Sequence, residues 1–105
     1  SLKKLCDAFG GVVLLKGQNT LIGRKENTPY MISAGNPGMS TAGMGDLLTG
    51  IISALYAQFR DQDLQLLTSV SALIHSTAGD RAARSGERGI IATDLFVELK
   101  DLLNP

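Results

Sequence analysis

Five of the chain's 12 glycines fall within residues 35–50, and this segment constrains the fold more than any other. Glycine adopts left-handed backbone readily, and inside a helix it costs about 1 kcal/mol relative to Ala. We therefore predict that residues 33–45 form a loop with a permissive backbone. This loop divides the chain, at about residue 42, into a half with strand-like patterns and a half with helical ones.

The first half contains three short strand-like segments joined by polar turns. A continuous apolar run at 12–15 predicts a strand that is buried on both faces. The short connections between the segments predict antiparallel hairpins. The strands are expected at residues 12–15, 20–22 and 28–32, after a helix over residues 1–8 that ends at Gly10 and Gly11.

Three helices are predicted for the second half, because apolar side chains recur there at helical spacing. The first is expected to begin at Leu47, and the last follows a cap at Thr93 or Asp94. The middle helix is expected to start after an N-cap at Asp63 and to run to about Arg84. Its predicted buried face consists of Leu66, Leu67, Val70, Leu73, Ile74 and Ala78.

This order of elements is unusual for a complete domain. A three-stranded sheet followed by all of its helices leaves the sheet short of strands and one side of the helices without a partner. We therefore expect the chain to be the C-terminal piece of a larger α/β protein. The alternative is that a second copy of the chain completes the sheet.

Composition excludes several classes of protein. A net charge of zero argues against a nucleic-acid footprint or an anionic membrane surface, and no apolar run is long enough for a spanning helix. A single Cys6 and a single His75 exclude an internal disulfide and a metal site built from these residue types. We expect Cys6 and His75 to be structural. No signal-peptide pattern is present, which predicts a cytoplasmic protein.

The end of the glycine-rich segment has the chemistry of an anion site. Gly43, Met44, Gly45 and Asp46 lead into a helix, whose first N–H groups and positive dipole end attract phosphate. The spacing fits neither a Walker loop nor the dinucleotide fingerprint. On spacing alone, the segment could equally be a plain connection with Asp46 as a cap or first-turn acid.

Residues 35–55, GNPGMSTAGMGDLLTGIISAL, closely resemble the signature of the ADP- or ATP-dependent NAD(P)H-hydrate dehydratases. These are members of the ribokinase-like superfamily, often labelled carbohydrate kinases. Two further segments match, residues 14–20 and 75–80, whereas Ser40 and Ala42 stand where the family usually has Ala and Gly. The resemblance implies that residues 1–105 are the C-terminal part of a ribokinase-like αβα sandwich, with short strands followed by about three helices.

The resemblance also implies a repair reaction on NADH or NADPH that has been hydrated at C6 of the nicotinamide. The nucleotide phosphorylates the C6 hydroxyl, and loss of phosphate restores the dihydronicotinamide. By the same resemblance, Asp46 binds the hydrate and takes the proton of its hydroxyl. The implied anion hole consists of the N–H groups of Ala42, Gly43, Met44 and Gly45. The implied nucleotide-binding residues are Lys16, Gly17, Gln18, Asn19, Thr20 and Gly45.

Several points stay open. Mg²⁺ is expected as the counter-ion of the nucleotide, but the sequence offers no protein ligand for it. The tail resembles bacterial members, which favours ADP over ATP, and the choice between NADH and NADPH hydrate is not determined. The alternatives are a sugar or vitamin-precursor kinase of the same superfamily and a non-catalytic packing module. Outside the motif, we expect Asp80 to pair with Arg84 one helical turn away.

Overall fold

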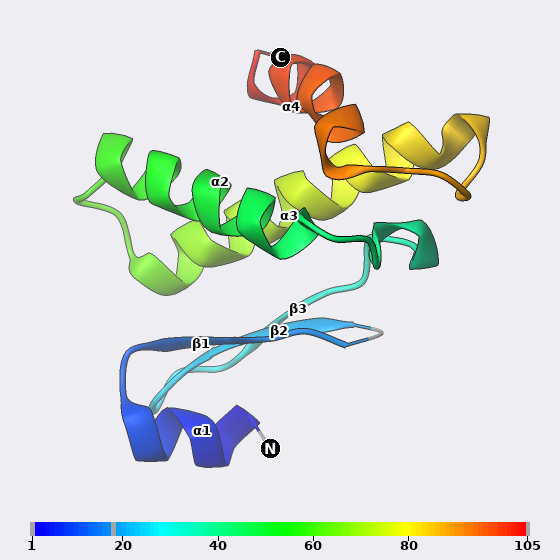
Figure 1. The fold of residues 1–105 in the computed structure, drawn as a ribbon. Coiled ribbons are helices and arrows are strands. Elements are labelled where there is room, and N and C mark those ends of the chain that lie inside the picture. Colours follow the sequence, from blue (N-terminus) through cyan, green and yellow to red (C-terminus); the bar gives the residue numbers. More distant parts are fainter. Residues whose placement is uncertain (1, 18, 105) are drawn as a thin grey trace.

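The computed structural model describes residues 2–17 and 19–104, which fold into three layers with a small sheet in the middle (Figure 1). One helix covers one face of the sheet, and a group of longer helices covers the other. In chain order the helices and strands are α1 (Leu2–Phe9), β1 (Val12–Leu15), β2 (Thr20–Arg24), β3 (Tyr30–Ile32), α2 (Met44–Gln58), α3 (Leu64–Ala82) and α4 (Leu95–Leu103). Short 3₁₀ turns lie at Pro37–Met39, Ala83–Ser85 and Ala92–Asp94.

The sheet is antiparallel throughout, with β2 between β1 and β3. The two predicted hairpins are therefore confirmed, although β3 begins at Tyr30 and not at residue 28. The prediction that residues 12–15 are buried on both faces is wrong. Three residues of β1 are half-buried and Leu15 is exposed, because β1 is an edge strand in the part of the chain that the structure describes.

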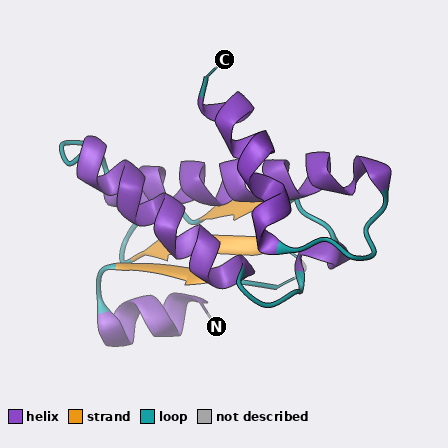
Figure 2. Cartoon of the chain, turned by 45° about the horizontal axis from the view of Figure 1, so that its top comes forward, coloured by secondary structure: helices purple, strands orange, loops and turns teal. Residues whose placement is uncertain are grey.

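Helix α1 packs on β1 and β2 from the side opposite the other helices (Figure 2). Its Cys6 is buried, as expected for a structural cysteine. The helix ends before Gly10 and Gly11, both with positive φ, which confirms the predicted termination at left-handed glycines.

Helix α3 is the centre of the larger helical layer. It contacts all three strands, and both α2 and α4 pack against it. Two groups of buried apolar side chains result, one between the helices and one between the helices and the sheet. The first consists of Met44, Ile51, Ala78, Ile90, Leu95 and Leu99, and the second of Ile22, Leu48 and Ala72.

The buried face of α3 differs from the predicted one. Leu66, Val70 and Leu73 are each more than 40% exposed. The buried positions are instead rich in small and polar residues, namely Gln65, Thr68, Ser69, Ser71, Ala72, His75, Ser76 and Gly79. Small side chains let α3 approach its neighbours closely, and hydrogen bonds offset the burial of the polar ones. Apolar spacing alone therefore selected partly the wrong side of this helix.

The helix boundaries also correct two expectations. Helix α2 begins at Met44, three residues before the predicted start at Leu47. Asp63 caps α3 as predicted, since its carboxylate accepts the N–H of Leu66 at 3.1 Å. Asp94 precedes α4 but does not cap it with its side chain; its carboxylate accepts the N–H of Ile91 at 2.9 Å.

Candidate functional site

A hollow of about 730 Å³ lies where the sheet, the glycine-rich loop and α3 meet. Its walls come from three separate parts of the chain. The turn between β1 and β2 supplies Lys16, Gly17, Asn19 and Thr20; the loop supplies residues 33–37, Met39 and Ser40; and the helices supply Leu48, Ala72, His75 and Ser76. The fold thus brings together segments that are far apart in the sequence.

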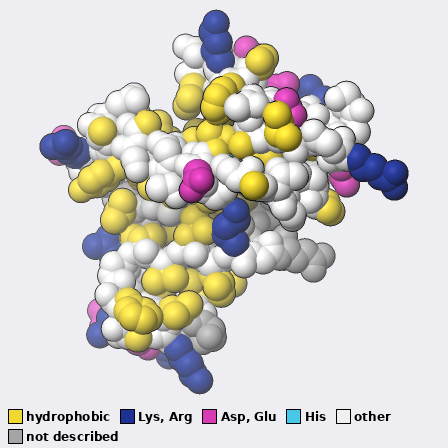
Figure 3. All heavy atoms as spheres, viewed as in Figure 1, with side chains coloured by type: hydrophobic (Ala, Val, Ile, Leu, Met, Phe, Trp, Pro, Cys, Tyr) yellow, Lys and Arg dark blue, Asp and Glu magenta, His cyan; other side chains and the backbone are white. Residues whose placement is uncertain are grey.

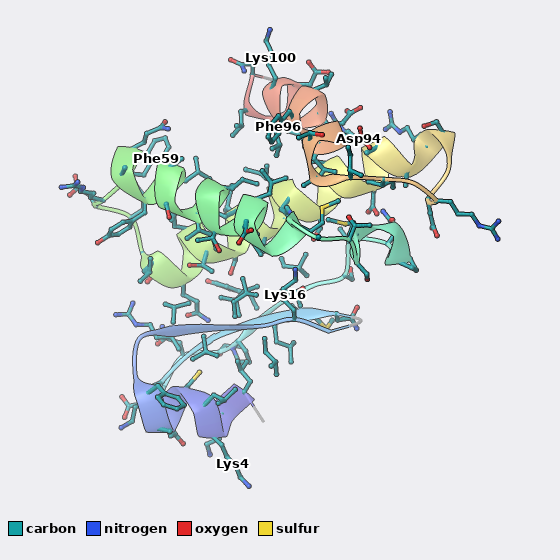
Figure 4. The ribbon with its side chains drawn as sticks, viewed as in Figure 1. Lys4, Lys16, Phe59, Asp94, Phe96 and Lys100 are labelled. Carbon is teal, nitrogen blue, oxygen red and sulfur yellow. The ribbon has the colours of Figure 1, made fainter. Side chains whose placement is uncertain are left out.

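The first wall contains most of the predicted nucleotide-binding stretch. Pairing of Leu15 with Leu21 fixes this turn at one end of the hairpin, with Lys16 and Thr20 at its two sides. Lys16 lies between the sheet and the α2–α3 layer (Figure 4). Gln18, also predicted to bind nucleotide, lies outside the described residues. The hollow therefore has a cation at its rim, where an anionic ligand would be favoured.

The second wall is the glycine-rich loop, which Asp80 holds against α3. One carboxylate oxygen of Asp80 accepts the N–H of Gly35 at 2.9 Å, and the other accepts the side-chain amide of Asn36 at 2.9 Å. The Asn36 oxygen in turn accepts the N–H of Gly38 at 3.0 Å. The predicted pairing of Asp80 with Arg84 is wrong, because the carboxylate is occupied by the loop.

A close packing contact supports the same loop. Met39 lies directly over Gly79 of α3, and a Cβ at position 79 would overlap the Met39 side chain. Met39 also lines the hollow. Met39 therefore both packs against α3 and forms part of the wall of the hollow.

The predicted anion hole lies at the N-terminus of α2. Gly43 precedes the helix with φ 89°, a left-handed conformation that favours glycine. The first N–H to bond back along the helix is that of Leu47, which donates to the Gly43 carbonyl at 2.9 Å. The N–H groups of Gly45 and Asp46 precede it, so they have no intrahelical acceptor. Two of the four predicted anion-hole residues, Met44 and Gly45, belong to α2, and the N–H of Met44 already donates to the Thr41 carbonyl at 3.4 Å.

Asp46 lies in the first turn of α2 and is exposed. It does not line the hollow, and its carboxylate has no hydrogen bond or ion pair within residues 2–17 and 19–104. Leu48, two residues further on, does line it. Residues two apart on a helix point to different sides, so Asp46 is exposed at the start of α2 and is not part of the wall of the hollow.

His75 is the buried titratable group of the hollow. It is only 3% exposed. Burial lowers the pKa of His75, nearby Lys16 lowers it further, and a hydrogen bond to the Met44 backbone acts in the opposite direction. Sequence reasoning noted residues 75–80 as a matching segment but gave no part of the site to it. The structure assigns two residues of that segment to the site: His75 lines the hollow, and Asp80 holds the loop that forms its second wall.

Within the described part of the chain, His, Cys, Asp and Glu side chains form no group of three that could hold a metal ion. Among the same residues, every helix is too short or too polar to cross a membrane.

Comparison with known proteins agrees with this arrangement. The sequence profile of a family described as NAD(P)H-hydrate dehydratase matches residues 1–101. The chain belongs to this family. A bifunctional NAD(P)H-hydrate repair enzyme of Coxiella burnetii is 48% identical over 108 aligned positions, and those of Escherichia coli and Leishmania braziliensis are 43% and 37% identical.

The alignments cover 97–100% of this chain but only 19–21% of those relatives. The chain thus spans about a fifth of the length of the repair enzymes that it matches.

Solved structures support the fold. Bacillus subtilis YxkO, a member of the UPF0031 family, superposes with a TM-score of 0.88 at 20% identity, covering 97% of this chain and 38% of YxkO. A hypothetical protein of Streptococcus mutans superposes with a TM-score of 0.78 at 25% identity, covering 88% of this chain and 32% of that protein. The predicted α/β fold class is confirmed.

Proposed function

We propose that this chain forms the nucleotide-binding part of a dehydratase that repairs hydrated NADH or NADPH at the expense of ADP or ATP. One observation carries the proposal: Lys16, Gly17, Asn19 and Thr20 line the same hollow as residues of the glycine-rich loop and Leu48 of α2. The family profile and the names of the relatives agree with it.

The residues of the hollow suit a phosphate-bearing nucleotide. Lys16 supplies a positive charge in its wall. The free N–H groups of Gly45 and Asp46 are not part of the lining; they lie at the N-terminus of α2, where phosphate binds well. Polar side chains around the hollow include Asn19, Ser40 and Ser76. In this proposal the anion hole stabilises the charge that develops on the transferring phosphoryl group. Mg²⁺ accompanies the nucleotide without a ligand from these residues.

Asp46 is the proposed base. Its exposed carboxylate lies next to the proposed anion hole, so that a hydroxyl held between them would have a proton acceptor on one side and the phosphoryl group on the other. We propose that Asp46 binds the hydrate and accepts the proton of its C6 hydroxyl. Phosphate departure then restores the dihydronicotinamide ring.

We also propose that residues 1–105 are the C-terminal part of a longer catalytic domain. Apolar side chains reach the surface over α1, the far end of α2, and α4 (Figure 3), and they include Phe9, Phe59, Phe96 and Val97. Leu66, Val70 and Leu73 of α3 are exposed as well. Large apolar side chains exposed on all four helices would be covered by further protein in the complete domain, and the rest of the domain is the proposed cover.

The test uses the complete enzyme and follows the return of NADH absorbance from hydrated NADH. Either ADP or ATP should support the reaction, and the comparison identifies the preferred nucleotide; running NADPH hydrate in parallel identifies the preferred substrate. Asp46→Ala and Asp46→Asn should lower kcat by at least about 100-fold, the scale of general-base catalysis, while nucleotide binding remains. Normal turnover in Asp46→Ala would exclude the role of this residue.

A second experiment tests the extent of the domain. The 105-residue chain alone should show little or no turnover under conditions in which the complete enzyme is active. Full activity of the chain alone would overturn the proposal that it is part of a longer catalytic domain.

A further inference from the structure

His75 has one ring nitrogen with no partner. Nε2 is buried and makes no hydrogen bond to the described residues. An unsatisfied buried polar atom destabilises the fold, so a native protein usually retains one for a reason. The His75 side chain also lines the hollow. The unpartnered atom and the ligand-sized volume therefore belong to the same place in the fold.

The other ring nitrogen fixes how Nε2 can act. The imidazole makes a hydrogen bond to the Met44 backbone that favours its protonated form, so that the ring donates and the carbonyl accepts. Nε2 has no partner among the described residues, so we assign this contact to the other ring nitrogen, Nδ1. In the neutral ring Nε2 then carries a lone pair, and in the protonated ring it carries a second N–H. His75 is attached to the first residue of α2 in either state.

Few charged side chains act on the His75 ring. Lys16, at the end of β1, is the charged side chain that disfavours the protonated ring. The loop contributes uncharged Asn36 and Ser40, and α2 contributes Leu48 beside the Met44 backbone. On α3 itself, Asp80 is occupied by Gly35 and Asn36, and the remaining acid near the start of α2, Asp46, does not line the hollow.

A phosphate group in the hollow would reverse this balance. Its negative charge would offset that of Lys16, and its oxygens would offer Nε2 the acceptor that the protonated ring needs. Hydrogen bonds between two charged groups are about twice as strong as neutral ones. Occupancy of the hollow by an anion and protonation of His75 would therefore favour each other.

We infer that His75 is a phosphate contact that takes up one proton from solvent when a phosphate-bearing ligand enters the hollow, and then donates Nε2–H to a phosphate oxygen. The inference rests on the proposed nucleotide site. With the contact between the His75 ring and the Met44 backbone, His75 would act as a positioning residue as well, because it would connect the ligand to the start of α2. Phosphate binding near Lys16 is thereby coupled to the first turn of α2, which carries Asp46.

The experiment is a titration of the complete protein with three probes: AMP, inorganic phosphate and adenosine. The imidazole ¹⁵N signals of His75 are assigned by their loss in His75→Gln. AMP and phosphate should move the Nε2 signal toward that of a protonated ring and raise the apparent pKa of His75, whereas adenosine should do neither. Calorimetry in buffers of different ionisation enthalpy should show proton uptake with the wild-type protein and less uptake with His75→Gln.

Affinity gives an independent measurement. His75→Gln should bind AMP about tenfold more weakly at pH 6, the fold-change expected for one charge-assisted hydrogen bond, and the difference should shrink at pH 8. The variant also controls for the protonation of AMP itself, which is the same in both proteins. A merely structural histidine would weaken binding equally at both values of pH.

The outcomes separate the inference from the proposed function. If AMP binds to the wild-type protein with unchanged His75 signals and no extra proton uptake, the inference is overturned and the nucleotide site stands. If phosphate shifts the His75 signals but AMP does not bind, the contact is supported and the nucleotide site is rejected. If no probe binds, both are rejected. The wild-type titration decides these cases even if His75→Gln fails to fold.

Discussion

The Asp80 carboxylate on α3 accepts the side-chain amide of Asn36, 44 residues earlier in the chain, at 2.9 Å. The same carboxylate accepts the N–H of Gly35, so that one side chain fixes two successive residues of the glycine-rich loop. The side-chain oxygen of Asn36 in turn accepts the N–H of Gly38, so that Gly38 is held in place as well. These hydrogen bonds attach the loop to α3 along one wall of the hollow.

The first prediction concerns this attachment. Asp80→Ala removes both hydrogen bonds, whereas Asp80→Asn keeps one acceptor oxygen. We expect a loss of stability of about 1–2 kcal/mol for Ala and about half of that for Asn, since these are partly exposed bonds of about 0.5–1.5 kcal/mol each. AMP affinity should fall in the same order. Chemical denaturation and calorimetry measure the two effects.

Arg84→Ala is the matched control for Asp80. The sequence pattern pairs Arg84 with Asp80, but the carboxylate is bonded to the loop instead. Arg84→Ala should therefore leave stability and AMP affinity within experimental error of the wild type. An effect as large as that of Asp80→Ala would show that the two residues act together after all.

The second prediction concerns Gly79 under Met39. A Cβ at position 79 would overlap three atoms of the Met39 side chain, so Gly79→Ala must displace Met39. Overpacking of this kind costs about 1–3 kcal/mol. Because Met39 lines the hollow, its displacement should also weaken AMP binding. Thermal unfolding and calorimetry report the two quantities.

The double variant Gly79→Ala, Met39→Ala tests the cause. Removing the long side chain makes room for the new methyl group, so the double variant should lose less stability than the two single losses added together. Simple additivity would show that Gly79 is needed for a reason other than Met39.

Local sequence patterns predicted much of this fold but not which face of α3 is buried. The hairpins, the end of α1 at Gly10 and the cap at Asp63 depend on neighbouring residues, and all were predicted correctly. The buried face of α3 depends on contacts with residues far away in the sequence. Gln65 and His75 are buried because they find partners in β2 and α2, and apolar spacing contains no information about such partners.

The candidate site likewise has parts that the sequence predicted and parts that it did not. The glycine-rich loop and the turn at residues 16–20 stand out in the sequence, and the hollow contains both. The contributions of Asp80, Gly79 and His75 are invisible to spacing, because each acts on a segment 30 to 45 residues earlier in the chain. Only the folded chain shows that one face of α3 holds both ends of that loop.

The third prediction is a pH dependence of stability. The pKa of His75 is lowered, mainly by burial, from its ordinary value of 6.5, so below pH 6.5 the unfolded chain binds this proton more readily than the folded one. The contribution of the neutral ring to the free energy of unfolding is therefore complete above pH 6.5. It is lost as the pH falls from there toward the folded-state pKa, with a slope of at most about 1.4 kcal/mol per pH unit.

Urea denaturation between pH 5.5 and 7.5, without ligand, measures this slope. His75→Gln should be less dependent on pH over the same range, because Gln does not titrate. Identical slopes for the two proteins would mean that His75 is protonated equally in the folded and unfolded states. Saturating phosphate should reduce the wild-type slope if the ring takes up a proton in the complex.

The last prediction concerns Gln65, which ties α3 to the sheet. Its side chain is 2% exposed, and its amide donates to the carbonyls of Ile22 and Thr28 at 3.2 and 3.1 Å while its oxygen accepts from Asn27. Gln65→Leu has a similar size but leaves the Ile22 carbonyl buried without this partner, so we expect a loss of about 2–3 kcal/mol. Gln65→Glu keeps the acceptor but loses the donor and adds a charge, so its loss of stability should exceed that of Gln65→Leu at neutral pH and shrink as the carboxyl becomes protonated.

The neighbouring Leu66→Gln, on the exposed side of the same helix, is the control and should cost less than about 0.5 kcal/mol. Equal losses for Gln65→Leu and Leu66→Gln in chemical denaturation would show that the face of α3 has been assigned incorrectly.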